Sequence, residues 1–324
     1  MSGTWQTDRV SSPSPPAVPR TPSWRTWSLR IAPYVVTGVV VAAILHRYPA
    51  AEIVREMGAG HALRMLPMAI ALAFVVWLPY ALCDRIVFEG AVGPIALRDV
   101  VRAKAATAVL LTLGYFLGGG GYAVWIGRTT RVGAARAAGA VLYVMASDLV
   151  AVCAVAGASM WLGGPGVSPS LRTVATWVFA VQVALIVLGP YGGWLRLPPL
   201  FDAWRKVPRA WSFAQIAGRT VNIAIITAVT WAAMRAFGID VPAAAAAMYV
   251  PVILLVTSLP INVAGLGAAQ AAWLLLLPWA SGPRLLAFQA LWQVFTGLGI
   301  IARGIPFVRG VVREIEDGKA AGAI

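Results

Sequence analysis

Asp148, Arg219 and Arg303 are ionisable side chains that lie inside long apolar runs of this 324-residue chain. Asp148 comes about ten residues into the run 139–162, so a helix would place it roughly 14 Å deep, near the middle of a bilayer. Arg219 and Arg303 lie in two later runs. A charged group in hydrocarbon is costly, and it often marks a substrate or ion pathway. Either arginine could pair with Asp148 at such a site, or the charges could serve structure alone.

Uncharged polar residues in the same runs include Asn222, Asn262 and Gln270. Their amides suit hydrogen bonds to a lipid headgroup, although packing between helices is the other use of such groups. The sequence shows no nucleophile beside a base and no paired carboxylates. Cys83 and Cys153 fall in apolar segments, and the chain has only two histidines, so no metal-ligand spacing can be assembled. We therefore predict no catalytic residue, no metal and no cofactor.

The composition is that of a membrane protein, because 60% of the residues are hydrophobic and only 12% are charged. The net charge of +14 does not indicate nucleic acid, since the basic residues stand in short clusters between apolar runs. We predict a disordered cytoplasmic tail over 1–30, a transmembrane helical domain over 31–308 and a cytoplasmic C-terminal tail over 309–324. The expected location is the inner membrane of a bacterial-type cell, with both termini in the cytoplasm.

Eight apolar runs must position these residues, and two of them are interrupted. The runs are 31–45, 65–83, 105–126, 139–162, 174–194, 213–237, 243–279 and 285–306. Glycines 118–121 interrupt the third run, and because each glycine costs a helix about 1 kcal/mol relative to alanine, we predict a break there. Pro260, Asn262, Gly265, Gly267 and Gln270 interrupt the seventh. Such interruptions persist in a membrane only where protein or a watery cavity covers them, so each predicts a re-entrant hairpin.

The charges of the loops decide whether the third run crosses or folds back. With a cytoplasmic N-terminus, the fold-back puts 18 basic residues inside and 5 outside, whereas a crossing gives 10 and 13. The positive-inside rule therefore favours the fold-back. The two hairpins then enter from opposite sides, which predicts an inverted repeat of the kind found in secondary transporters.

The segment Pro260 to Gln270, PINVAGLGAAQ, resembles the signature of the transmembrane region of lysylphosphatidylglycerol synthases and related flippase-like proteins. That signature has a proline and a small polar residue before a Gly-Gly-Leu-Gly run and an Arg-Glu pair. The glycine run and Asp148 resemble the family's first-half motif, in which an arginine commonly stands three residues before an aspartate. Here Met145 occupies that arginine position, and Ala269 and Gln270 replace the Arg-Glu pair of the other motif. The resemblance implies a membrane protein that moves lipids between leaflets.

The sequence thus predicts an all-α polytopic membrane protein, a helical bundle with two opposed re-entrant hairpins related as an inverted repeat. Its expected function is that of a lipid flippase or lipid transporter. The alternatives are a membrane-embedded enzyme acting on a lipid-linked substrate and a non-transporting scaffold. The expected partners are membrane lipids, with a second copy of the chain or a lipid-modifying enzyme possible. The predicted substrate-binding residues are Asp148, Arg219, Asn222, Asn262, Gly265, Gly267, Gln270, Arg303, Gly118, Gly119, Gly120 and Gly121.

Overall fold

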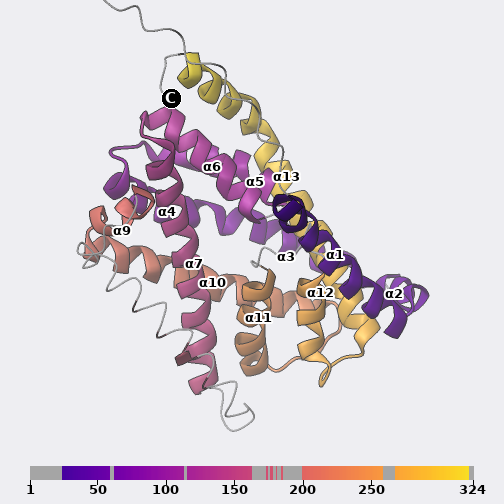
Figure 1. Cartoon of the computed structure of the whole chain (residues 1–324). Helices are drawn as coiled ribbons and strands as arrows, with labels where there is room; N and C mark the ends of the chain where they lie inside the picture. The colour runs from indigo at the N-terminus through magenta and orange to yellow at the C-terminus, as the bar shows by residue number, and fades with distance from the viewer. Residues whose placement is uncertain are drawn as a thin grey trace, which may run out of the picture.

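The computed structural model describes residues 24–58, 62–112, 115–162, 199–257 and 267–320, together with residues 173, 176, 177, 180 and 184. Within these ranges the chain is helical and contains no strand (Figure 1). In chain order the elements are α1 (Trp24–Arg47), α2 (Ala50–Met57), α3 (Ala62–Val75), α4 (Trp77–Ala91), α5 (Leu97–Leu111), α6 (Tyr115–Thr130), α7 (Ala134–Leu162), the 3-10 turn η2 (Pro199–Phe201), α9 (Asp202–Lys206), α10 (Arg209–Ala236), α11 (Ala243–Thr257), α12 (Ala268–Trp273), the 3-10 turn η3 (Leu274–Leu276) and α13 (Gly282–Ala320).

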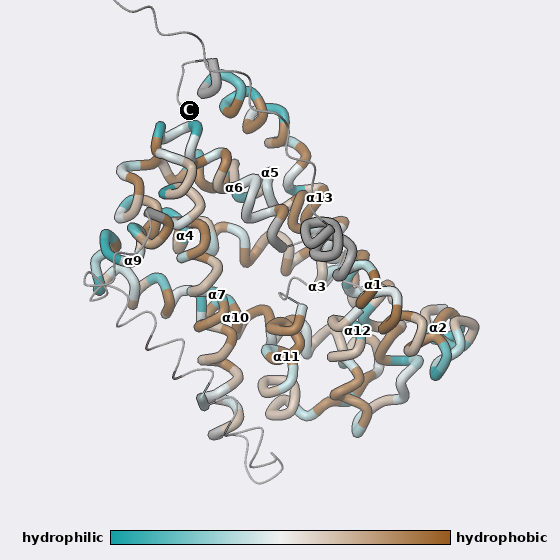
Figure 2. The backbone as a smooth tube through the Cα atoms, in the orientation of Figure 1, coloured by the Kyte–Doolittle hydropathy of each residue, from teal (hydrophilic) through white to brown (hydrophobic). Residues whose placement is uncertain are grey.

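Several of these helices are long and apolar enough to cross a membrane. Four segments meet that condition, namely Ala62–Ala91, Ala134–Met160, Arg209–Ala236 and Gly282–Asp317. A fifth crossing results if α1 and α2, which meet at an angle of 81°, form one broken span. Hydrophilic residues gather at α2, at α9 and at the end of α13, whereas the helices between them are mainly hydrophobic (Figure 2). The chain is therefore an all-α, multi-pass membrane protein, as its composition predicts.

The first of these spans is longer than the run 65–83 and contains a break. Helix α3 ends at Val75 and α4 begins at Trp77. Pro79 explains the break, because proline has no N–H to donate to the carbonyl of Val75, four residues earlier. The predicted span 174–194 lies outside the described residues apart from four isolated positions.

The ends of the helical region extend beyond the predicted boundaries. Helix α1 already begins at Trp24, inside the segment 1–30 for which we predicted disorder. Helix α13 continues past residue 308 to Ala320. Packing explains this continuation, because Val311 is buried in the same core cluster as Val100 and Ala103 of α5. Helix α13 is thus held against the bundle up to Ile315, and its end projects beyond the neighbouring helices (Figure 1).

The glycine run lies inside a helix, so the prediction of a break at the glycines is wrong. Gly118 to Gly121 belong to α6, and the chain turns before Tyr115. Close packing offsets the low helix propensity of glycine. A Cβ atom at Gly118 would lie 2.6 Å from Cγ of Leu111, and one at Gly121 would lie 2.7 Å from Cδ1 of Leu110. Gly118 meets the end of α5, and a Cβ atom at Gly121 would also lie 3.6 Å from Cγ2 of Thr107, one turn earlier, so the two helices are antiparallel. That this pair returns to the same side of the membrane stays a prediction.

The second interrupted run also forms two arms that pack on each other. Helix α11 ends at Thr257, and α12 with η3 covers 268–276, close to the predicted arms 243–259 and 268–279. Residues 258–266, which include Asn262 and Gly265, lie outside the described residues. Gly267 precedes α12 with φ of +93°, a backbone conformation that favours glycine.

Two hydrogen bonds between helices mark the opposite ends of the bundle. At one end Arg136, near the start of α7, donates from Nε to the Ala91 carbonyl of α4 over 2.9 Å. At the other end Arg284, near the start of α13, donates to the Phe237 carbonyl after α10 over 3.4 Å. Helix α13 connects the two ends along one side of the molecule and contacts α2, α3, α5 and α6 (Figure 1).

Candidate functional site

A buried guanidinium on α10 joins two other helices through ion pairs. Nη1 of Arg219 donates to Oδ1 of Asp148 on α7, and Nη2 donates to Oδ1 of Asp84 on α4. The side chains of Arg219 and Asp84 have no exposed surface. Three helices of the bundle are therefore connected at one point by charge-assisted hydrogen bonds.

A lysine from α5 completes the site, which we call the charge cluster (Asp84, Lys104, Asp148 and Arg219). Nζ of Lys104 lies 2.7 Å from Oδ2 of Asp84. The ring of Tyr80 faces both cations, at 5.4 Å from the Arg219 guanidinium carbon and 5.2 Å from Lys104 Nζ. With two carboxylates and two cations the cluster is formally neutral, which reduces the cost of holding charges among apolar helices.

The burial of the charge cluster is uneven. Arg219 and Asp84 are inaccessible, whereas the side chain of Asp148 is 20% exposed and that of Lys104 is 18% exposed. The cluster is therefore accessible from outside the bundle at Asp148 and at Lys104. Removing one member of a buried pair leaves an uncompensated charge, which costs about 3 to 5 kcal/mol.

Arg219 belongs to a row of buried polar residues that we call the α10 polar face. Its members are Ser212, Gln215, Arg219 and Asn222, spaced three, four and three residues apart as one side of a helix requires. The hydroxyl of Tyr143 on α7 lies 2.7 Å from Oγ of Ser212. By contrast, neither amide atom of Gln215 has a hydrogen-bond partner among the described residues, and neither does Nδ2 of Asn222.

The register between α7 and α10 aligns these groups. Tyr143 meets Ser212, Asp148 meets Arg219, and Ala151 and Val152 pack with Ile223. Because both members of each successive pair advance along the chain, the two helices run in the same direction past each other. This alignment places the unpartnered amide of Gln215 and the unpartnered Nδ2 of Asn222 on either side of the Arg219 ion pairs.

Only some of the predicted site residues come together. Asp148 and Arg219 pair, and Asn222 lies on the same helical face as Arg219. Arg303 does not pair with Asp148, although the sequence left both arginines as candidates for that pair. It donates from Nη1 to the Ala73 carbonyl of α3 and lies 5.3 Å from the centre of the Trp77 ring. The reason is that α13, which carries Arg303, packs against α3.

The other predicted residues lie in different places. Gln270 lines a cavity of about 200 Å³ between α1, α2 and α13. Gly267 approaches α1, since a Cβ atom there would lie 3.0 Å from Oγ1 of Thr37. Gly119 contacts α7 beside Met145, where a Cβ atom would lie 3.0 Å from the sulfur. The positions of Asn262 and Gly265 are not among those that the structure describes.

Sequence reasoning missed Asp84 and Lys104. Asp84 follows the run 65–83 directly and precedes Arg85, so it resembled the charged end of a span. The available signal was the apolar segment after it, because Ile86, Val87 and Phe88 continue the helix and Val87 and Phe88 are fully buried. Lys104 is one of the 18 basic residues that the fold-back places on the cytoplasmic side, although alanines flank it on both sides.

No protein-family model matches the chain, and no curated protein matches it either. The resemblance to the transmembrane region of lysylphosphatidylglycerol synthases therefore stays a prediction that depends on short motifs.

Proposed function

We propose that this protein is a membrane transporter that moves a phospholipid-like or lipid-linked molecule between the two leaflets. The observation that carries the proposal is the charge cluster, which lies between helices long and apolar enough to span a membrane. Ionisable groups at such positions are expensive, and in membrane proteins they commonly line the pathway of a substrate. The unpartnered amides of the α10 polar face add hydrogen-bonding capacity directly beside Arg219.

The arrangement suggests how an anionic headgroup would bind. Arg219 is held by two carboxylates, and Asp148 is the more exposed of the two. Asp84 also pairs with Lys104, so it keeps two cationic partners if Asp148 moves away. In the proposed mechanism a headgroup phosphate replaces the Asp148 carboxylate at Nη1 of Arg219, because a guanidinium binds phosphate and carboxylate with similar geometry. The amides of Gln215 and Asn222 would then bond the remaining headgroup oxygens.

Reconstitution of the full-length protein into liposomes tests the function. Fluorescent phospholipids in the outer leaflet should become inaccessible to a membrane-impermeant quencher faster than in protein-free liposomes. Asp148→Asn keeps the side-chain volume and removes the carboxylate that competes with the phosphate for Arg219, so a bound headgroup is released more slowly. The rate should fall at least about tenfold, since a charged hydrogen bond contributes about 1.5 to 3 kcal/mol. The matched control is Asp240→Asn, because the Asp240 side chain is 91% exposed and far along the chain from the cluster.

Both variants must be shown to insert and fold, by detergent-solubilised size-exclusion profiles that match the wild type. A wild-type protein that moves no lipid above the protein-free rate would contradict the proposal and favour the scaffold. A folded Asp148→Asn protein with the wild-type rate would remove the charge cluster from the mechanism.

A further inference from the structure

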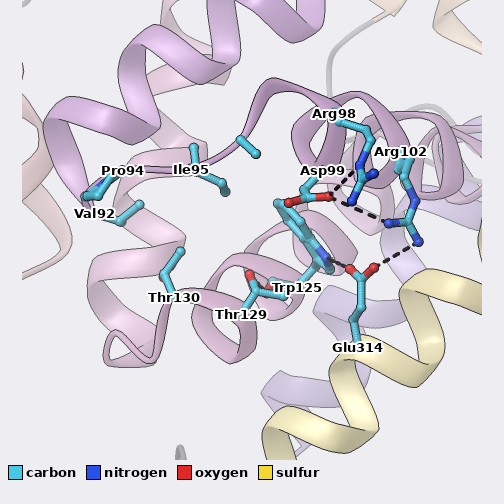
Figure 3. A pocket seen from close by; sticks show the side chains of 12 residues that line it. Val92, Pro94, Ile95, Arg98, Asp99, Arg102, Trp125, Thr129, Thr130 and Glu314 are labelled. Atoms are coloured by element: carbon cyan, nitrogen blue, oxygen red, sulfur yellow. Dashed lines mark hydrogen bonds and ion pairs between the residues drawn. The ribbon is translucent and has the colours of Figure 1, made fainter.

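A cavity of about 510 Å³ lies at the end of the bundle where α4 is followed by α5 (Figure 3). Its walls come from the α4–α5 connection, the first turn of α5, the last turns of α6 and the C-terminal part of α13. Neither the charge cluster nor the α10 polar face contributes to it. The cavity is therefore a separate place at which this protein could bind a ligand.

Four charged side chains line this cavity, two of each sign. Nη2 of Arg102 lies 2.9 Å from Oε1 of Glu314, and Nη1 lies 3.6 Å from Oδ1 of Asp99. Nε of Arg98 lies 3.7 Å from the same Asp99 oxygen. Nε1 of Trp125 donates to Oε2 of Glu314 over 2.8 Å, so Glu314 joins α13 to both α5 and α6 (Figure 3).

These groups are more exposed than those of the charge cluster. The side chain of Arg98 is 83% exposed, and those of Asp99 and Glu314 are 36% and 30% exposed. Thr129 and Thr130 also line the cavity, and their hydroxyls donate to the Trp125 and Ile126 carbonyls. The lone pairs of the two hydroxyl oxygens are therefore free to accept hydrogen bonds from a ligand.

The balance of charge limits the chemistry of that ligand. A simple anion would meet two carboxylates, and a simple cation would meet two guanidinium groups. A ligand with an amine and a phosphate finds a partner for each group. The N-terminus of α5, at residues 96–99, adds the positive end of a helix dipole on the side of Arg98. Glu314 and the two threonine oxygens provide the acceptors for an ammonium group.

We propose that this cavity binds a zwitterionic amino-phosphate group, with the phosphate at Arg98 and the α5 N-terminus and the ammonium at Glu314, Thr129 and Thr130. The headgroup of an aminophospholipid and a soluble amino-phosphate share this chemistry. The site does not depend on the proposed transport function, because it uses none of the residues assigned to translocation.

Binding to the purified full-length protein in detergent tests the proposal by isothermal titration calorimetry. Four probes separate the requirements: dihexanoyl phosphatidylethanolamine, dihexanoyl phosphatidylglycerol, O-phosphoethanolamine and inorganic phosphate. The phosphatidylethanolamine probe should bind at least about tenfold more tightly than the phosphatidylglycerol probe or phosphate, because both of these lack the ammonium. O-phosphoethanolamine binding equally well would identify a soluble ligand, and binding more weakly would identify a lipid; both results support the site.

Two variants with matched controls assign the binding to this cavity. Glu314→Gln retains an acceptor for Trp125 and removes the charge, so it should weaken binding of the phosphatidylethanolamine probe about tenfold. Glu316→Gln removes the same charge from an exposed position of α13 and should have no effect. Arg98→Gln should also weaken binding about tenfold, whereas Arg309→Gln, at an exposed position of α13, should not. Equal affinity for all four probes, no saturable binding, or equal loss in variants and controls would overturn the proposal.

Discussion

The Gln215 amide lies four residues before Arg219 on α10, where it has no exposed surface and no hydrogen-bond partner among the described residues. A buried amide without partners costs about 1 to 3 kcal/mol. A leucine has a similar volume and would remove that cost. A group that lowers stability without an evident structural benefit is expected at functional sites more than elsewhere, because activity can require it.

We therefore predict opposite effects of Gln215→Leu on stability and on lipid movement. The variant should raise the free energy of unfolding by about 1 to 3 kcal/mol, because an unsatisfied polar group is replaced by an apolar one. It should lower the rate of lipid movement, because the headgroup loses a hydrogen-bonding partner beside Arg219. Denaturant titration in detergent and the liposome assay measure the two quantities. Loss of stability would mean that the amide is satisfied in the folded protein, and unchanged transport would exclude it from the pathway.

Among single residues, the sequence indicated the Asp148–Arg219 pair because both charges interrupt apolar runs. It could not indicate that Arg303 faces α3, because depth along a run does not fix which side of a helix meets which neighbour. Asp84 and Lys104 were missed for a related reason. Each lies near the end of an apolar run, where sequence alone does not distinguish a buried charge from one in water.

At the level of elements, the α5–α6 hairpin shows why helix propensity alone misplaced the break. Propensity counts the local cost of four glycines, whereas the folded protein also gains the contacts that the missing side chains permit. Gly118, Gly119 and Gly121 each have a neighbour within 3.0 Å of a Cβ position, on α5 or α7. Gly120 has no atom within 4 Å of that position.

This difference predicts opposite effects of two alanine substitutions that lie two residues apart in α6. Gly120→Ala should stabilise the protein by about 0.5 to 1 kcal/mol, because alanine favours the helix and meets nothing. Gly118→Ala should destabilise it by about 1 to 3 kcal/mol, because the new methyl group would lie 2.6 Å from Cγ and 3.2 Å from Cα of Leu111. Thermal unfolding of the two purified variants against the wild type measures both changes. Two stabilised variants would show that α5 and α6 are not packed this closely.

The two hairpins of the fold both contact α7, on either side of Asp148. Gly119 of the first hairpin approaches Met145, while Met248 of the second packs with Ala156 and Met160. The charge cluster thus lies between the two contact levels. That the two hairpins re-enter the membrane from opposite sides, as an inverted repeat, stays a prediction.

At the scale of the whole molecule, basic residues mark both ends of the bundle. Arg98, Arg102 and Arg136 lie at the end where α4 is followed by α5, whereas Arg284 lies at the opposite end. Residues at one end should face the same compartment if the helices cross a bilayer. The positive-inside rule can therefore be tested by measuring which side of the membrane a few exposed positions face.

We predict that Arg131, before α7, and Arg205, in α9, face the cytoplasm, and that Arg55, in α2, faces the periplasm. All three are exposed. Helix α2 packs beside the start of α13, at the end opposite the cavity that Arg98 and Arg102 line. Arg172 should share the periplasmic side, although it lies outside the described residues.

Cysteine labelling tests this orientation. The buried Cys83 and Cys153 are first replaced by alanine, and single cysteines then replace each arginine. An impermeant maleimide added to intact cells should label the cysteines at 55 and 172 only, and those at 131 and 205 should react after lysis. Labelling of position 131 in intact cells, with 55 protected, would show that the protein has the opposite orientation in the membrane. Labelling of 55 and 131 from the same side would exclude the fold-back of α5 and α6, and with it the inverted repeat.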